Sequence, residues 1–206
     1  KERVIEAREF AEKAERSNNE NSGFEHDLAY AIERLYSAGS WSEFFGKGTK
    51  PIKIDKNLLM GSCMAKISEA EERLQYVQVF FPDIGFETRK ELDFAYDNLK
   101  KENYALCLFK ASKAKAEADS VLNAMSMSEK TINKIIDTKL GIIKNIIIEQ
   151  TEKGNFPILG YSYYEYADSL KEEDYPSALL YLEYSLELSN LDIYFKDDKK
   201  KIGYEL

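Results

Sequence analysis

The chain has 206 residues, 44% of them hydrophobic and 32% charged, which is the composition of a globular protein and enough length for one domain of ordinary size. Its net charge of −8 argues against nucleic acid as a partner, because phosphate backbones attract clustered lysine and arginine. With 4 prolines, 10 glycines, one histidine and two cysteines, the composition also disfavours a turn-rich all-β fold and most metal or nucleophile chemistry.

The first quarter of the chain has helical periodicity. It predicts an amphipathic helix over 3–16, a second helix over 24–38 and a short third one over 40–45. Leu35 and Trp41, separated by small residues, suggest a weak helical hairpin over 24–45. The chain begins at Lys1 inside the first helical pattern, so we expect it to be part of a longer protein.

A longer helix is predicted between Leu59 and Phe81, where apolar residues recur at steps of three and four and a proline and a glycine soon follow. Cys63 lies on this apolar stripe, and Cys107 lies on the stripe of a later helix. Two cysteines do not make a disulfide framework. We therefore expect both to be small buried hydrophobic residues, as free cysteine commonly is.

An internal repeat organises the second half of the chain. Residues 96–104 align with residues 167–175 in a register of 71 positions, with identical residues in five of the nine places. Each copy is a short acidic turn between two helical patterns, so the repeat predicts antiparallel hairpins over 88–123 and 157–189. A leucine before the turn, an aromatic residue after it and a small residue three positions on follow the packing logic of tetratricopeptide repeats (TPR).

Between the two hairpins, an isoleucine-rich pattern that begins near Ser128 predicts another helix. Its apolar stripe is wide, so we expect this helix to be central. The predicted fold is all-α: an irregular bundle or array of antiparallel helical hairpins, TPR-like, in a single domain over 1–206 with a tail over 190–206. The copies are about twice as far apart as TPR units, which disfavours a regular superhelix.

Few residues could carry chemistry. His26, the single histidine, lies beside two carboxylates on a predicted helix and is expected at the surface or the core edge. We also expect Lys110, Lys113 and Lys115 to be solvated, because they lie off the alanine-rich face of their helix. We therefore predict no catalytic residue, no metal site and no cofactor. No apolar run is long enough for a membrane span, so direct membrane insertion is not expected.

Tyrosine is concentrated near the end of the chain, where eight of the 14 tyrosines lie between Tyr161 and Tyr194. Aromatic residues at helical spacing usually belong to the core, but eight rings around one hairpin exceed what one core face can hold. Two interpretations stay open: a core alone, or a core with a surface that binds protein partners. The candidate anchors of that surface are Tyr161, Tyr164, Tyr181 and Tyr184.

The last hairpin also resembles a known family. Residues 156–167 (FPILGYSYYEYA) and 178–188 (ALLYLEYSLEL), with 103–109 and 113–118 before them, are similar to the helical region of archaeal membrane-tethered Lon-like serine proteases. In that family a Lon-type protease domain with a Ser-Lys dyad precedes the helical region, and a membrane segment near the C-terminus tethers the protein. The shared motifs are packing motifs. No serine here has the Gly/Pro-flanked setting of the nucleophile, so the resemblance implies no catalytic residue in this chain.

We expect a non-catalytic helical accessory domain that binds protein or peptide partners, including copies of itself. The resemblance implies that it serves a Lon-like serine protease by presenting substrate, holding subunits together or spacing the protease from the membrane. One alternative is a free-standing TPR-like scaffold that is unrelated to proteolysis. Another is an enzyme that uses carboxylates inside a helical bundle. The sequence leaves the compartment and the oligomeric state open.

Overall fold

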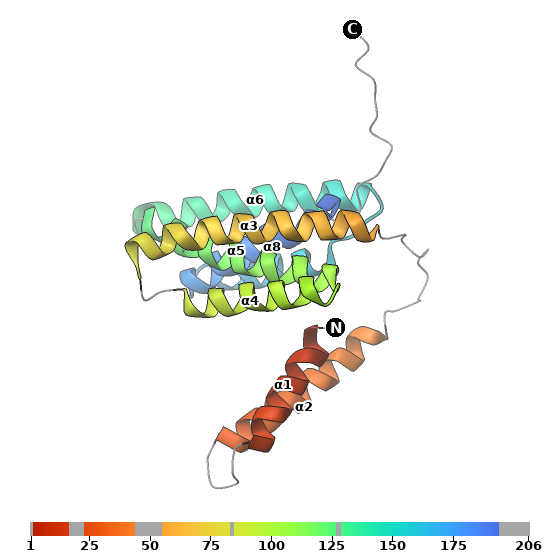
Figure 1. Cartoon of the computed structure of the whole chain (residues 1–206). Coiled ribbons are helices and arrows are strands. Elements are labelled where there is room, and N and C mark those ends of the chain that lie inside the picture. Colours follow the sequence, from red (N-terminus) through yellow and green to blue (C-terminus); the bar gives the residue numbers. More distant parts are fainter. Residues whose placement is uncertain (1, 17–22, 44–54, 83–84, 127–128, 194–206) are drawn as a thin grey trace. The chain divides into compact units, whose positions relative to one another are not determined.

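The computed structural model describes residues 2–16, 23–43, 55–82, 85–126 and 129–193, and every regular element among them is helical (Figure 1). The all-α prediction is confirmed. Where the sequence predicted one domain over 1–206, the packing divides the chain into two compact units, Lys1–Lys53 and Ile54–Leu206.

The first unit is an antiparallel pair of helices, α1 (Glu2–Arg16) and α2 (Gly23–Ser42). Its polar contacts run in opposite directions along the two helices: Arg3 bonds to Ser37, Arg34 to Glu6, and Lys13 to Asp27. Buried alanines on both helices let the two backbones approach closely. The predicted helix over 3–16 therefore matches α1.

α2 is one continuous helix through Gly39 to Ser42, so the weak hairpin predicted over 24–45 is wrong. A glycine inside a helix costs about 1 kcal/mol relative to alanine. Contacts of α2 with α1 on both sides of Gly39 offset that cost, since Ser37 before it accepts a hydrogen bond from Arg3 and the ring of Trp41 after it packs under the Arg3 guanidinium group. The last two residues of the predicted hairpin lie outside the described residues.

The second unit contains the remaining elements: α3 (Lys56–Phe80), α4 (Phe86–Lys100), α5 (Tyr104–Ser126), α6 (Glu129–Glu152), α7 (Ile158–Leu170), α8 (Tyr175–Ser189) and a short 3₁₀ helix, η1 (Leu191–Ile193). α4 with α5 and α7 with α8 make the antiparallel pairs that the internal repeat predicted. Figure 1 shows α3, α4 and α5 running lengthwise beside one another. Of the tail predicted over 190–206, the residues after Ile193 lie outside the described ones.

Helix ends in this unit follow local chemistry. The Asp55 carboxylate caps α3 by accepting hydrogen bonds from the backbone N–H groups of Asn57 and Leu58. Asp174 caps α8 in the same way through the N–H of Ser177. The starts of α3 and α8 are therefore fixed by residues that lie next to them in the sequence.

Two apolar clusters form the core of the unit. The first joins α3, α4 and α5 through Leu59, Cys63, Ile67, Ala70, Leu74, Leu92, Ala95, Cys107, Leu108, Ala111 and Ala114. The second joins α6, α7 and α8 through Ile136, Leu140, Ile143, Ile147, Ala167, Ala178, Leu179 and Leu182. α5 also packs against α8, which connects the two hairpins through their second helices.

The central helix is α5 rather than α6. α5 packs against α3, α4 and α8, and Ala111 and Ala116, which point to different sides of it, are both fully buried. α6 packs against α7 and α8 but leaves Ile142 and Ile148 exposed. The prediction of a central isoleucine helix is wrong, because small side chains let several helices surround α5 while bulky isoleucines fill the space on one side of α6.

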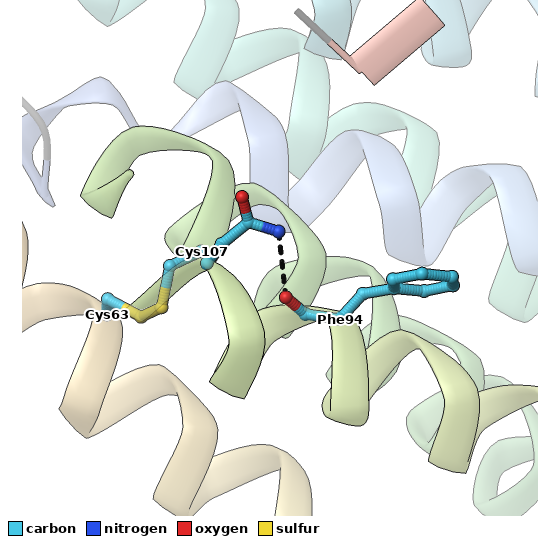
Figure 2. The surroundings of a disulfide bond; sticks show 4 residues. Cys63, Phe94 and Cys107 are labelled. Atoms are coloured by element: carbon cyan, nitrogen blue, oxygen red, sulfur yellow. Dashed lines mark hydrogen bonds between the residues drawn. A yellow bond between two sulfur atoms is a disulfide. The ribbon is translucent and has the colours of Figure 1, made fainter. Parts of the chain in front are cut away.

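Cys63 of α3 and Cys107 of α5 are joined by a disulfide inside the first apolar cluster (Figure 2). Their Cα atoms are 5.8 Å apart, which is an ordinary span for such a bridge. The burial of both residues is confirmed, but the expectation of free cysteines is wrong. Each cysteine has an apolar setting in the sequence, and the pairing arises because α3 packs against α5 at this level.

Candidate interaction surface

Small residues lie where α7 and α8 of the last hairpin contact each other most closely. The Ser185 hydroxyl donates a hydrogen bond of 2.7 Å to the carbonyl of Gly160. A Cβ atom on Gly160 would lie 2.8 Å from backbone atoms of Ser189, closer than a carbon atom can pack, so the contact requires glycine. With the helices this close, six of the seven tyrosines of the hairpin gather in two groups beside the contact rather than within it.

The first group is a row of three rings. The ring centroids of Phe156 and Tyr161 are 5.4 Å apart, and those of Tyr161 and Tyr164 are 6.4 Å apart with nearly parallel planes. Tyr164 packs against the second apolar cluster, whereas Phe156 and Tyr161 are exposed. The row therefore leads from the core to solvent.

The second group consists of Tyr163 and Tyr166 on α7 with Tyr181 and Tyr184 on α8, and we call it the tyrosine cluster. Centroid distances within it are 5.8 Å for Tyr163–Tyr181, 5.1 Å for Tyr163–Tyr184, 5.7 Å for Tyr166–Tyr181 and 6.3 Å for Tyr181–Tyr184. These separations are those of favourable aromatic pairs. The cluster runs from Tyr166, which is 58% exposed, to Tyr184, which is 8% exposed.

The inner end of the tyrosine cluster is fixed by a polar contact with α5. The Tyr184 hydroxyl donates a hydrogen bond of 2.7 Å to Glu117, and the ammonium group of Lys113 lies 5.5 Å from the centre of the Tyr184 ring. Burial and the neighbouring Glu117 carboxylate raise the pKa of Tyr184 far above its ordinary value. The phenol stays neutral and remains a hydrogen-bond donor.

The four predicted anchors have different environments. Tyr161 is exposed, Tyr164 and Tyr181 are half-buried, and Tyr184 is buried. The prediction that Tyr184 is a surface anchor is therefore wrong. Tyr184 lies on the side of α8 that packs against α5, and it supports the other rings from inside. Tyr166 was missing from the prediction although it is the most exposed ring of the tyrosine cluster, since its helical spacing had indicated a core position.

We define the tyrosine surface by the aromatic residues of both groups that are exposed or half-buried: Phe156, Tyr161, Tyr163, Tyr164, Tyr166 and Tyr181. Exposed carboxylates of Glu165 and Asp168 lie on the same helix. A hydrogen bond between Tyr161 and Glu165 raises the pKa of that tyrosine. The surface therefore combines neutral phenol rings with negative charge.

Lysines of α5 that the sequence analysis expected to be solvated are instead held in ion pairs. Lys110 is 6% exposed, and its ammonium group lies 3.1 Å from one oxygen of Glu91 on α4. Lys113 lies 3.3 Å from the other oxygen of Glu91, and Lys115 pairs with Asp119 and with Glu187 of α8. The prediction is wrong for all three, because α4 and α8 cover this helix with carboxylates.

Glu183 of α8 is a buried carboxylate, and it accepts hydrogen bonds from Lys139 of α6 and Asn123 of α5. Burial raises the pKa of Glu183, and Lys139 opposes that change. This contact ties three helices together.

His26 of α2 has an exposed side chain beside Asp27, which confirms its surface position. A hydrogen bond from Lys13 lowers the pKa of Asp27. Within the described ranges no three His, Cys, Asp or Glu side chains are grouped so that they could hold a metal ion. None of the helices described combines the length and the apolar character that crossing a membrane requires.

Comparison with known proteins adds no identification. No family model, no curated protein and no solved structure matches the chain.

Proposed function

We propose that this chain is a protein-binding helical domain and that the tyrosine surface is where it docks its partner. The observation that carries the proposal is the continuous set of ring contacts that begins at exposed Tyr166, passes through Tyr181 and ends at Tyr184, which is buried and hydrogen-bonded to Glu117. Rings held in this way lose little conformational freedom on binding, which favours tyrosine at interfaces.

The chemistry of the surface also suggests a kind of partner. Its phenol groups donate hydrogen bonds, and Glu165 adds negative charge beside them, while the charge of Asp168 is paired with Lys171 at 3.0 Å. A complementary partner presents apolar side chains together with lysine or arginine, because arginine stacks on aromatic rings and pairs with carboxylates. Binding rather than catalysis is the role that this arrangement favours.

The resemblance to the helical region of Lon-like serine proteases extends the proposal. On that basis the domain is an accessory part of a protease, and it presents substrate, holds subunits together or spaces the protease from the membrane. The alternative is a free-standing TPR-like scaffold. The complete reading frame discriminates between them, because a serine-protease domain in the same frame supports the accessory role and its absence supports the scaffold.

The disulfide between Cys63 and Cys107 supports a further part of the proposal, that the domain matures in an oxidising compartment. Structural disulfides persist in secreted, periplasmic and cell-surface proteins, whereas reducing systems keep most cytosolic thiols free, with hyperthermophiles as an exception. The accessory role is compatible with such a location outside the cytosol.

The surface is tested by replacing Tyr161 and Tyr166 with serine in one variant and Tyr36 and Tyr76 in a control variant, since the latter two are exposed outside the surface. Sedimentation velocity over a concentration series reports self-association, and circular dichroism reports helix content. A photo-crosslinking amino acid at position 161 or 36 reports partners in cells. We expect weaker association for the first variant, unchanged helix content in both, and crosslinks at position 161. Equal behaviour of the two variants and of the two positions would reject the surface.

A further inference from the structure

The region where α3 ends and α4 begins carries the most exposed large apolar side chains among the described residues of the second unit. Val79 is 74% exposed, Phe80 60% and Phe86 69%. Phe81 is exposed as well, and we call these four residues the apolar tip. The tip lies at one end of the second unit, where α3 gives way to α4 (Figure 1).

The backbone on both sides of the tip is fixed to the rest of the unit. The N–H group of Phe81 donates a hydrogen bond of 2.8 Å to the carbonyl of Val77, which ends α3. Gly85, before α4, has a φ of 111°, and a Cβ atom there would lie 2.7 Å from the side chain of Leu74 in the first apolar cluster. Glycine therefore lets this backbone pack directly on the core. The exposure of the tip belongs to a packed part of the fold.

α5 adds an apolar side chain at the same end of the unit. α3 and α5 run in the same direction, and Arg73 of α3 pairs with Asp119 of α5 at 3.2 Å. Phe80 lies seven residues after Arg73 and Met125 lies six after Asp119, so the two reach the same level. Met125 is 40% exposed. The apolar end of the unit therefore extends from the tip onto α5.

Polar side chains begin one helical turn behind the tip. Tyr76 precedes Phe80 by four residues and Lys90 follows Phe86 by four, which places each about 6 Å further from the end of the unit. Tyr76 is 50% exposed, and the Lys90 ammonium group lies 4.5 Å from the centre of the Phe86 ring. Tyrosine and lysine occupy the headgroup level of a bilayer when apolar neighbours lie deeper. The depth of the tip matches the 5–10 Å, roughly, to which interfacial segments bury their apolar face.

The charges around the tip indicate which kind of bilayer it suits. The segment 76–90 contains two acids, Asp83 and Glu87, and two bases, Arg89 and Lys90, so its formal charge is zero, while the whole chain carries −8. An anionic membrane attracts clustered lysine and arginine and repels an acidic protein. The tip therefore suits a zwitterionic surface.

An exposed apolar patch marks contact either with a protein or with a membrane. The tip consists of one valine and three phenylalanines, which carry no hydrogen-bonding group, unlike the phenols of the tyrosine surface. Protein interfaces draw most of their binding energy from tyrosine, tryptophan and arginine side chains seated in well-packed pockets. Fluid acyl chains need no preformed pocket. The composition of the tip therefore favours lipid.

We propose that the apolar tip docks the domain on the surface of a zwitterionic lipid bilayer. Phe80, Phe81 and Phe86 lie where the headgroups meet the acyl chains, with Tyr76 and Lys90 among the headgroups. The contact is with one face of the bilayer and does not cross it. The site is separate from the tyrosine surface, and the proposal does not rest on the proposed function.

The test is flotation of the full chain with phosphatidylcholine vesicles. One variant combines Phe80→Ser with Phe86→Ser and so removes two rings of the tip. The matched control combines Ile142→Ser with Ile148→Ser, which are exposed on α6 outside the tip. Circular dichroism without vesicles checks that both keep the parent's helix content. We expect the parent and the control to float alike, and the tip variant to partition more weakly by about tenfold for each ring removed.

Failure of the parent chain to float, or equal partition of the two variants, would overturn the proposal. Vesicles in which phosphatidylserine replaces part of the phosphatidylcholine test the charge argument, and we expect weaker binding to them. Equal or stronger binding to these vesicles would overturn the assignment to a zwitterionic surface. Crosslinks from a photo-reactive amino acid at position 86 to a protein, together with no flotation, would assign the tip to a protein partner instead.

The depth of insertion is measured with a tryptophan reporter. The chain has one tryptophan, so Trp41→Phe gives a silent background, in which Phe86→Trp reports on the tip and Ile142→Trp is the control. Phosphatidylcholine brominated in the upper part of its acyl chains quenches a ring that enters the bilayer. We expect quenching at position 86 and none at position 142. No quenching at position 86, or equal quenching at both, would contradict insertion of the tip.

Discussion

Cys63 and Cys107 join the outer helix α3 to the central helix α5, and both are fully buried in the apolar cluster that those helices share. The two residues are separated by 44 positions, so the bond closes a long loop that includes all of α4. The disulfide therefore restricts the conformations of the unfolded chain strongly. In the folded chain it is inaccessible to solvent.

Reducing this disulfide should lower the free energy of unfolding by about 4 kcal/mol, the value that loop-closure entropy gives for this separation. The protein is reduced in denaturant, refolded with reductant present and compared with the oxidised form by urea titration. The double variant Cys63→Ala, Cys107→Ala should show a similar loss and no response to reductant. Equal midpoints for the oxidised and reduced forms would contradict the role given to the bond.

Glu117 should make stability depend on pH. Burial raises the pKa of its carboxyl above the ordinary 4.5, so the folded state holds the proton more tightly than the unfolded chain does. The contribution of this group to the free energy of unfolding therefore falls as pH rises from the unfolded pKa to the folded one. Glu117→Gln keeps an acceptor for Tyr184 but does not ionise.

We expect the Glu117→Gln variant to gain stability relative to the parent chain as pH rises above about 4.5, until the difference levels off beyond the folded pKa. Urea titrations at a series of pH values measure it. Glu173→Gln, an exposed carboxylate in the turn before α8, is the control. A stability difference for Glu117→Gln that does not change with pH would refute the prediction.

Lys110→Met should destabilise the protein by about 1–2 kcal/mol, because the half-buried Glu91 loses its closest partner and keeps only Lys113. Lys100→Met is the matched control on α4, where the side chain is exposed, and it should change stability by less than about 0.5 kcal/mol. Thermal unfolding of both variants under identical conditions gives the comparison. Similar losses in the two variants would mean that Lys110 is not buried in its ion pair.

Gly160→Ala should cost about 1–3 kcal/mol or more, because the added methyl group would collide with the backbone of Ser189 and push α7 away from α8. Gly141→Ala, in the middle of α6 with open space around the site, should instead stabilise the protein by about 0.5–1 kcal/mol. Chemical denaturation measures both changes. Two stabilised variants would disprove the close contact.

The two paired hairpins of the second unit could be predicted because the signals are local. An acidic capping residue, such as Asp174 before α8, fixes where a helix begins. An apolar stripe at helical spacing fixes which face of the helix is buried. The stripe from Leu59 to Val77 is buried throughout α3. Such patterns depend on residues only a few positions apart.

The tertiary structure decided which faces meet. For some residues the sequence suggested a role that the packing of the helices changed. The sequence indicated a surface position for Tyr184 and Lys110 and free thiols for the two cysteines, whereas the packed structure gives them a hydrogen bond, an ion pair and a disulfide. Partners such as Glu117 for Tyr184 lie 67 positions away in the chain. Helical periodicity shows that a side chain faces inward or outward, but the identity of its neighbour depends on how helices cross, which is a property of the whole packed unit.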